Sequence, residues 1–178
     1  MGRLILILLL FITFPTLGQQ KAREKIKTTA QTLEKQTFTA KVIRIIDGDT
    51  MEVLYKGKPV RIRLAHIDCP EKRRSQPFGN AAKQALSDLC FGHQVGVSSD
   101  RCDRYGRLIA VITNNKHQNI NQEMVKQGMA WHFKKYSTDS VYAKLEQDAR
   151  SNHIGLWKEA HPVAPWEWRK PNKKVLKM

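Results

Sequence analysis

The sequence predicts a mainly β domain of the α+β class, in which five strands form a small barrel and about three α-helices pack outside it. Two observations lead to this prediction. Segments between residues 37 and 113 carry the period-two alternation or the β-branched composition of strands. Apolar residues at helical spacing occur once between these strands and again near the end of the chain. Periodicity alone does not show whether the barrel closes.

Five segments have the composition or the alternation of strands: residues 37–46, 51–55, 60–67, 93–97 and 107–113. The first is rich in Thr, Val and Ile, which favour extended backbone. A Lys-Gly-Lys-Pro sequence separates the second segment from the third and is typical of a turn, so these two are expected to form a hairpin. We expect a polar loop between the last two strands.

Three further segments are predicted to be helical. Between Phe78 and Cys90, apolar residues fall at positions 78, 81, 82, 85, 86 and 89, which places them on one face of a helix. Two more helices are expected to run to about residues 128 and 150, each preceded by residues that favour the N-cap. The candidate caps are Asn119 or Asn121 for one and Asp139 or Ser140 for the other.

Both ends of the chain lie outside the predicted domain, residues 37–169. Residues 1–18 combine a positive Arg3, an apolar run and a small-x-small sequence, the pattern of a secretory signal peptide. Residues 19–36 form a polar spacer or loosely helical arm, and residues 170–178 form a basic tail. We therefore expect an exported protein, secreted or periplasmic, with no stable membrane span after cleavage. The alternative is an uncleaved signal anchor that tethers the chain to a membrane.

The charge of the chain favours a polyanionic partner. Lys and Arg number 31 against 16 Asp and Glu, a net charge of +15. Such an excess favours nucleic acid or an anionic membrane surface, and charge alone does not choose between them. Wholesale disorder is excluded, because 41% of the residues are hydrophobic.

The three cysteines, Cys69, Cys90 and Cys102, allow at most one internal disulfide in an exported protein. Three separate, mostly buried thiols are at least as well supported as a bridge. A structural zinc site would also recruit His66 and His93, but the sequence has no paired C-x-x-C.

Short loops beside the predicted strands carry acids and arginines. They are Asp47-Gly48-Asp49-Thr50, Asp68-Cys69-Pro70-Glu71 and Asp103-Arg104-Tyr105-Gly106-Arg107, with Arg63 on the third strand. Neighbouring acids repel one another unless a cation or arginines offset them. Oxygen ligands suit Ca²⁺ or Mg²⁺ better than zinc, and arginine binds phosphate in a bidentate fashion. A cation, carboxylates and arginines around one phosphate are the components of phosphodiester cleavage.

Each of these motifs also has a purely structural explanation. Asp-Gly-Asp-Thr is a good turn sequence, and an arginine such as Arg63 on a polar strand face is usually solvated. An EF-hand loop that begins at Asp47 is excluded, because its twelfth position is Lys58 and not Glu. Only the combination of the motifs, in this order, indicates chemistry.

The combined motifs resemble the thermonuclease family of secreted, micrococcal-type nucleases. The matching strings are R-I-I-D-G-D-T, R-L-A-H-I-D-C-P-E, D-R-Y-G-R, K-Q-G-M-A, I-G-L-W and P-W-E-W-R, which together span about residues 37–169. The resemblance implies a five-stranded OB-type β-barrel with three helices. It also implies calcium-dependent hydrolysis of DNA and RNA, in which the bond to the 5′ oxygen breaks and 3′-phosphates remain. A monomer is expected.

The resemblance also implies roles for individual residues. Asp49 and Asp68 would bind Ca²⁺ together with the main-chain carbonyl of Cys69, where the family often has Thr. Glu71 would position or deprotonate the attacking water. Two further groups follow from the same motifs: Arg63 and Arg107 at the scissile phosphate, and Arg104 and Tyr105 at a neighbouring phosphate. Phe133 and Tyr136 are candidates for base stacking.

Two other functions compete with the nuclease. An OB-type barrel can hold single-stranded nucleic acid in a basic, aromatic groove without cutting it. A pure binding module would not need Asp49, Arg63, Asp68, Glu71 and Arg107 at once, so we prefer the enzyme. A membrane-surface protein would explain the basic ends but would leave the acidic loops unexplained.

Overall fold

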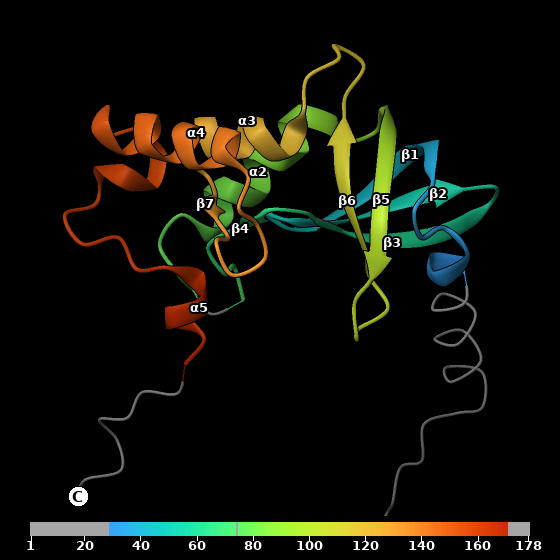
Figure 1. Ribbon diagram of the computed structural model, residues 1–178, viewed down its shortest axis with the longest axis horizontal. Coiled ribbons are helices and arrows are strands. Elements are labelled where there is room, and N and C mark those ends of the chain that lie inside the picture. Colours follow the sequence, from blue (N-terminus) through green and yellow to red (C-terminus); the bar gives the residue numbers. More distant parts are fainter. Residues whose placement is uncertain (1–28, 74, 171–178) are drawn as a thin grey trace, which may run out of the picture.

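The computed structural model describes residues 29–73 and 75–170, and a closed five-stranded β-barrel forms one side of it, with the helices α2 to α5 on the other (Figure 1). The order around the barrel is β1-β2-β3-β6-β5, and β5 pairs with β1 to close it. Its strands are β1 (Thr37–Asp47), β2 (Thr50–Tyr55), β3 (Lys58–Leu64), β5 (Gln94–Cys102) and β6 (Leu108–Thr113). All neighbours are antiparallel except β3 and β6. The predicted fold class, an OB-type barrel with packed helices, is confirmed.

Two strands end three or more residues from their predicted ends. The polar loop expected after residue 97 is mostly strand, because β5 continues to Cys102 and pairs with β6 through a bulge between Ser99 and Arg101. Polar side chains do not prevent this, since the ladder is made by backbone groups. The expected strand at 60–67 is interrupted at His66, whose φ of 68° takes the chain out of the extended region. The short strand β4 (Ile67–Asp68) follows and pairs with β7 (Trp131–His132).

The three predicted helices are present, as α2 (Gly79–Cys90), α3 (Ile120–Lys126) and α4 (Ser140–Ser151). Asn119 caps α3 by accepting from the Gln122 N–H, and Asp139 caps α4 by accepting from the Val141 N–H. Asn121, the alternative cap, is instead buried, and its amide joins β6 to Ala65. The 3₁₀ helix η1 (Gly155–Lys158) and the short α5 (Pro165–Trp168) were not predicted.

The core has two parts that meet beside the β4–β7 pair. The barrel interior and the inner faces of α2 and α3 form the larger cluster, and Trp131, Trp157 and Leu156 form the centre of the smaller one. The two parts are tied together where Gly128 contacts η1: its carbonyl accepts from the Leu156 N–H. A Cβ on Gly128 would lie 2.1 Å from a backbone oxygen, so only glycine fits there.

The end of the predicted polar spacer packs on the barrel. Residues 29–32 are helical, and Ala30 and Leu33 are buried. Ser99 on β5 fixes this segment, because its hydroxyl contacts the carbonyls of Leu33 and Gln36 and accepts from the Gln36 N–H. The described part of the spacer thus extends the barrel core.

Other sequence expectations concern residues beyond this description. The predicted signal peptide (1–18), the start of the spacer and residues 171–178 of the predicted basic tail lie outside the described residues. Among the described residues, the helices are too short or too polar to cross a membrane. In the same part of the chain all three cysteines are free thiols, so neither the disulfide nor the cysteine–histidine zinc site is formed.

Candidate active site

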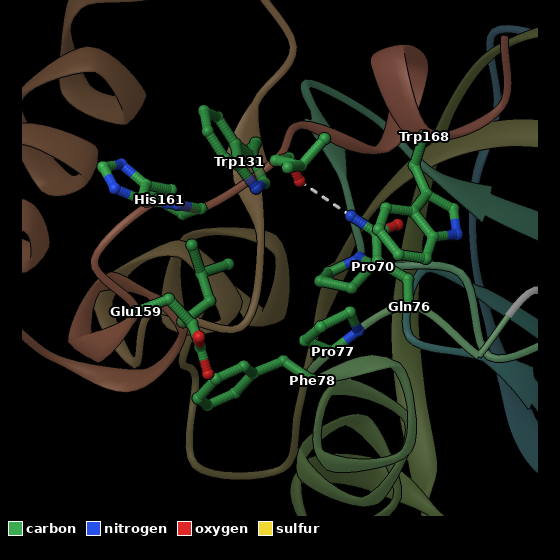
Figure 2. A pocket seen from close by; sticks show the side chains of 11 residues that line it. Pro70, Gln76, Pro77, Phe78, Trp131, Glu159, His161 and Trp168 are labelled. Atoms are coloured by element: carbon green, nitrogen blue, oxygen red, sulfur yellow. Dashed lines mark hydrogen bonds between the residues drawn. The ribbon is translucent and has the colours of Figure 1, made fainter. Parts of the chain in front are cut away.

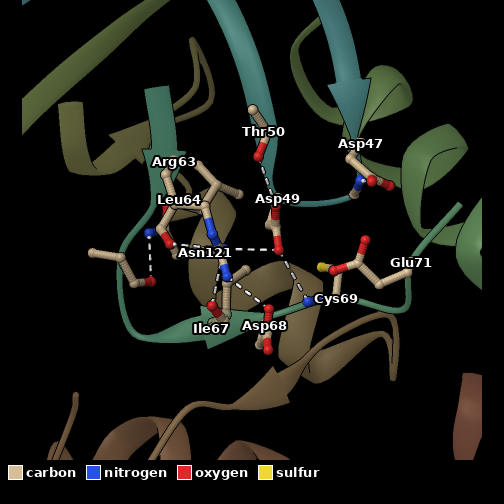
Figure 3. Close-up of polar contacts among 12 residues, drawn as sticks. Asp47, Asp49, Thr50, Arg63, Leu64, Ile67, Asp68, Cys69, Glu71 and Asn121 are labelled. Atoms are coloured by element: carbon tan, nitrogen blue, oxygen red, sulfur yellow. Dashed lines mark hydrogen bonds and ion pairs between the residues drawn. The ribbon is translucent and has the colours of Figure 1, made fainter. Parts of the chain in front are cut away.

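Arg63 stands at the centre of the polar residues at one end of the barrel (Figure 3). The register of β2 and β3 pairs it with Thr50, so its side chain lies beside Asp49. Its Nη1 is 2.8 Å from Oδ2 of Asp49, and its Nη2 donates to Oδ1 of Asp68 at 2.7 Å. Nη1 also donates to the carbonyl of Ile67, which fixes the turn into β4. One guanidinium thus joins the two loops that sequence analysis marked as cation ligands.

This arrangement is buried, which makes its charges interdependent. Arg63 is 9% exposed and Asp68 is fully buried. Burial opposes the charge of Arg63, but Asp49 and Asp68 outweigh it and raise the pKa of the guanidinium. Burial also raises the pKa of Asp68, with Arg63 opposing the shift. Burying either charge without an opposite charge beside it would strongly destabilise the fold.

Asp49 is held in place by the tight packing of its turn. Its Oδ1 accepts from the Thr50 hydroxyl and its Oδ2 accepts from the backbone N–H of Cys69. A Cβ on Gly48 would lie 2.7 Å from Cβ of Ala82 and 2.9 Å from Cβ of Cys69, so the turn requires glycine to approach α2 this closely. The two loops therefore meet through backbone as well as through Arg63.

The Cys69 side chain packs against the Gly48 turn, where its Sγ lies 3.2 Å from the position that a Cβ on Gly48 would take. Burial raises the pKa of its thiol well above the ordinary value, and Asp49 adds to the effect. The group is therefore a neutral thiol at physiological pH, and its hydrogen-bonding contribution to the site comes from the backbone. A side chain at this position needs only to fit the core.

Asp47 belongs to the Asp-Gly-Asp-Thr motif, and the structure brings it near Asp49 and Glu71 (Figure 3). Burial raises the pKa of Asp47, and the charges of Asp49 and Glu71 raise it further. Four acids, Asp47, Asp49, Asp68 and Glu71, thus contribute to one negative region. The repulsion between these four carboxylates indicates that the region favours a bound cation.

Arg169 is a site residue that sequence analysis did not identify. It lies 101 residues from Asp68 along the chain, yet its Nη2 is 2.6 Å from Oδ2 of that residue. Its Nη1 is 2.5 Å from Oε1 of Glu71. The only sequence signal was its place at the end of the P-W-E-W-R motif, which does not indicate what the arginine contacts.

Gln76 connects the Glu71 loop to the C-terminal segment. Its Oε1 accepts from the Glu71 N–H at 2.9 Å, and its Nε2 donates to the carbonyl of Val163 at 2.7 Å (Figure 2). Beside it lies a cavity of about 50 Å³, with Trp131 and Trp168 in its lining. This volume holds only a few water molecules, so the cavity is too small for a nucleotide.

The second predicted catalytic arginine, Arg107, lies at the edge of this group. Arg107 directly precedes β6, whose Ile109 pairs with Arg63 in the parallel ladder. Its guanidinium binds Asp103 through Nε and Nη2, both at 2.7 Å. The structure therefore places Arg107 at the start of the strand next to Arg63 but pairs it with a different carboxylate.

Arg104 and Tyr105 form an exposed turn next to Arg107. Tyr105 is 65% exposed, and the guanidinium groups of Arg104 and Arg107 lie 4.9 and 5.5 Å from its ring centre. The base-stacking candidates lie elsewhere, on the loop after β7. Phe133 stacks on Trp166 with ring centres 5.3 Å apart, and Tyr136 meets Phe133 edge to face.

The donor set fits a hard cation. Asp49 and Asp68 supply carboxylate oxygens, which suit Ca²⁺ or Mg²⁺ better than zinc. Among the described residues, no three side chains of the His, Cys, Asp and Glu types form a complete cation cage. A cation held here would therefore need backbone carbonyl, water or substrate oxygens to complete its shell, as expected for a catalytic site that leaves positions open.

Comparison with known proteins agrees with this geometry. The family model described as staphylococcal nuclease homologue matches residues 61–159. An uncharacterized endonuclease of Haemophilus influenzae is 44% identical over 149 residues, which cover 83% of this chain and 82% of the relative. Micrococcal nuclease of Shigella flexneri is 40% identical over 146 residues, 76% of this chain and 83% of the relative.

A staphylococcal-like nuclease of Arabidopsis thaliana is 36% identical over 160 residues, which cover 89% of this chain and 48% of the plant protein. The bacterial matches extend over most of both chains and include the strands and loops that carry Asp49, Arg63, Asp68 and Glu71. Together with the closed barrel, these matches show that the chain belongs to the staphylococcal nuclease family.

Proposed function

We propose that this chain, a phosphodiesterase endonuclease by its family, is a calcium-dependent enzyme that cleaves DNA and RNA and leaves 3′-phosphates. The observation that carries the proposal is the buried Arg63, which joins Asp49 and Asp68 within reach of the Glu71 loop. Oxygen ligands, a carboxylate base and phosphate-binding arginines meet there. A protein that only bound nucleic acid would not need to bury this much charge.

The cation would be held by Asp49, Asp68 and the carbonyl of Cys69. When bound, Ca²⁺ would supply Lewis-acid polarisation of a phosphate oxygen. The tight turn at Gly48 and the hydrogen bond from the Cys69 N–H to Asp49 keep the two ligand loops together. This preorganisation lowers the cost of assembling the site around substrate.

Glu71 is the general base in this mechanism. Its backbone is fixed by Gln76, and its side chain is 22% exposed, so solvent water can reach it. Glu71 would take a proton from the water that attacks phosphorus in line. The bond to the 5′ oxygen then breaks, which leaves the phosphate on the 3′ side.

Arg63 and Arg107 would stabilise the charge that grows on the equatorial phosphate oxygens. The contacts of Arg63 with the described carboxylates involve its two Nη atoms. Loss of one such donor costs about 10²–10³ in rate. Arg104 and Tyr105, exposed on the adjacent turn, would bind a neighbouring phosphate.

The test is an activity assay on heat-denatured DNA and on RNA, in Ca²⁺, in Mg²⁺ and in EDTA. Glu71→Gln removes the base, and Glu123→Gln on α3 is the matched control, since Glu123 pairs only with Lys126 on the same helix among the described residues. We expect cleavage in Ca²⁺ alone, lost in Glu71→Gln and retained in Glu123→Gln. Products with 3′-phosphates should resist terminal transferase until a phosphatase is added.

Other outcomes would reject parts of the proposal. Cleavage in EDTA would reject the cation requirement, and equal rates for both Gln variants would reject Glu71 as base. A salt-sensitive gel shift without cleavage would make the chain a single-strand binding module instead.

We also infer export of this enzyme from the signal-like residues 1–18. N-terminal sequencing of the protein from culture medium, periplasm and membrane fractions tests this inference. A new terminus after Gly18 supports cleavage and release, whereas an intact terminus confined to the membrane fraction supports the signal anchor.

A further inference from the structure

The C-terminal Arg169 makes contacts that no role in the proposed mechanism uses. Its Nη2 and Nη1 lie 2.6 and 3.3 Å from Oδ2 and Oδ1 of Asp68, and Nη1 also binds Glu71. Asp68 is fully buried, and Nη2 of Arg63 also donates to its Oδ1. Both oxygens of a predicted cation ligand are thus occupied by guanidinium groups.

We propose that Arg169 is a positioning residue that competes with the divalent cation for Asp68 and Glu71, so that cation binding displaces the C-terminal arginine. This inference rests on the proposed calcium site. A ligated Ca²⁺ lies 2.3–2.6 Å from a carboxylate oxygen, about the distance at which Nη2 of Arg169 now sits. The two positive groups cannot share that position.

Charge favours the exchange. The four acids Asp47, Asp49, Asp68 and Glu71 outnumber Arg63 and Arg169, so the region keeps excess negative charge. A doubly charged cation in place of a singly charged arginine reduces that excess. Arginine is always protonated in proteins, so Arg169 repels a nearby cation at any physiological pH.

The C-terminal end of the segment that carries Arg169 can move more easily than its start. Helix α5 has only four residues, too few to be stable alone, so its place depends on what it touches. Its start is anchored, because Trp166 stacks on Phe133 and meets Trp131 edge to face (5.6 Å between ring centres). Val163, just before it, is held by Gln76 (Figure 2). The arginine at its far end can therefore leave the carboxylates while the start remains in place.

The experiment measures Ca²⁺ affinity by calorimetry for the full chain, Arg169→Gln and Lys170→Gln. Lys170 is the matched control, because the same charge is removed one residue away and its partner is the exposed Glu167. We expect Arg169→Gln to bind Ca²⁺ about 10–100-fold more tightly than the parent, which is within the usual range of coupling between sites. Lys170→Gln should change the Ca²⁺ affinity by less than about threefold. Arg169→Lys, which keeps the charge but loses the fork, should lie between parent and Arg169→Gln.

Tryptophan fluorescence gives a second readout, since Trp168 directly precedes the moving arginine. Ca²⁺ should change the emission of the parent and change that of Arg169→Gln much less. If both bind Ca²⁺ with equal affinity, Arg169 is only a structural clamp and the inference fails while the calcium site stands. If neither binds Ca²⁺, the proposed cofactor fails together with it. Binding by Arg169→Gln alone would support the competition. Should Arg169→Gln not fold, the same comparison is made with Arg169→Lys.

Discussion

Removal of the Arg63 side chain should destabilise the protein far more than removal of any exposed arginine. In Arg63→Ala, Asp68 keeps Arg169 as partner, but Asp49 keeps only the Thr50 hydroxyl and the Cys69 N–H. One buried carboxylate is left without a counter-charge. Breaking a buried pair in this way costs about 3–5 kcal/mol, a large part of the roughly 5–15 kcal/mol that holds a typical domain. Arg63→Lys keeps the charge but cannot reach both acids, so the loss of one charged hydrogen bond should cost about 1.5–3 kcal/mol.

The assay is urea unfolding followed by tryptophan fluorescence in EDTA, with Arg61→Ala as control. Arg61 lies on the same strand, but its side chain is 42% exposed and pairs with Glu52, so its removal should cost no more than about 1 kcal/mol. Nuclease activity of the folded fraction of Arg63→Ala should also fall about 10²–10³-fold. If Arg63→Ala unfolds within 1 kcal/mol of Arg61→Ala, the buried ion pairs do not hold the two loops together and the reasoning is wrong.

Three further predictions follow from the same contacts. Gly48→Ala forces a methyl group against Ala82 and should lower the free energy of unfolding by about 1–3 kcal/mol. Gly96→Ala should be tolerated, because the added Cβ would lie 3.7 Å from its nearest neighbour. Equal melting temperatures for the two variants would contradict this reasoning. Burial raises the pKa of Cys90 from 9.0 to about 12, so its contribution to stability is complete below pH 9 and is lost as pH rises towards 12. Between pH 9 and 10.5, the free energy of unfolding measured in urea should fall by about 2 kcal/mol less in Cys90→Ala than in the parent. The same pH dependence in both proteins would refute the assignment. Arg104→Gln should reduce the slope of log affinity for single-stranded DNA against log salt by about 1, with no such change in Lys144→Gln on α4.

Local sequence patterns determined most of the secondary structure. Strand alternation, the apolar face of α2 and the caps Asn119 and Asp139 depend on residues within a few positions of each other, so they can be recognised without the rest of the fold. The acids Asp49, Asp68 and Glu71 were identified because their motifs are short and continuous. Family resemblance then supplied the barrel topology, which periodicity does not contain.

Only the tertiary structure decided how these residues meet. The polar end of β5 became a strand because β6 offered it backbone partners and because Gln36 offered its backbone N–H and carbonyl to the Ser99 hydroxyl, which the composition of β5 does not reveal. Arg107 was paired with Asp103 in its own turn. Arg169 reached Asp68 across 101 residues because aromatic packing placed α5 beside the Glu71 loop. The sequence by itself determined which chemical groups are present and which local elements carry them. Their mutual distances were set by barrel closure and by packing between distant segments, which are cooperative properties of the whole chain.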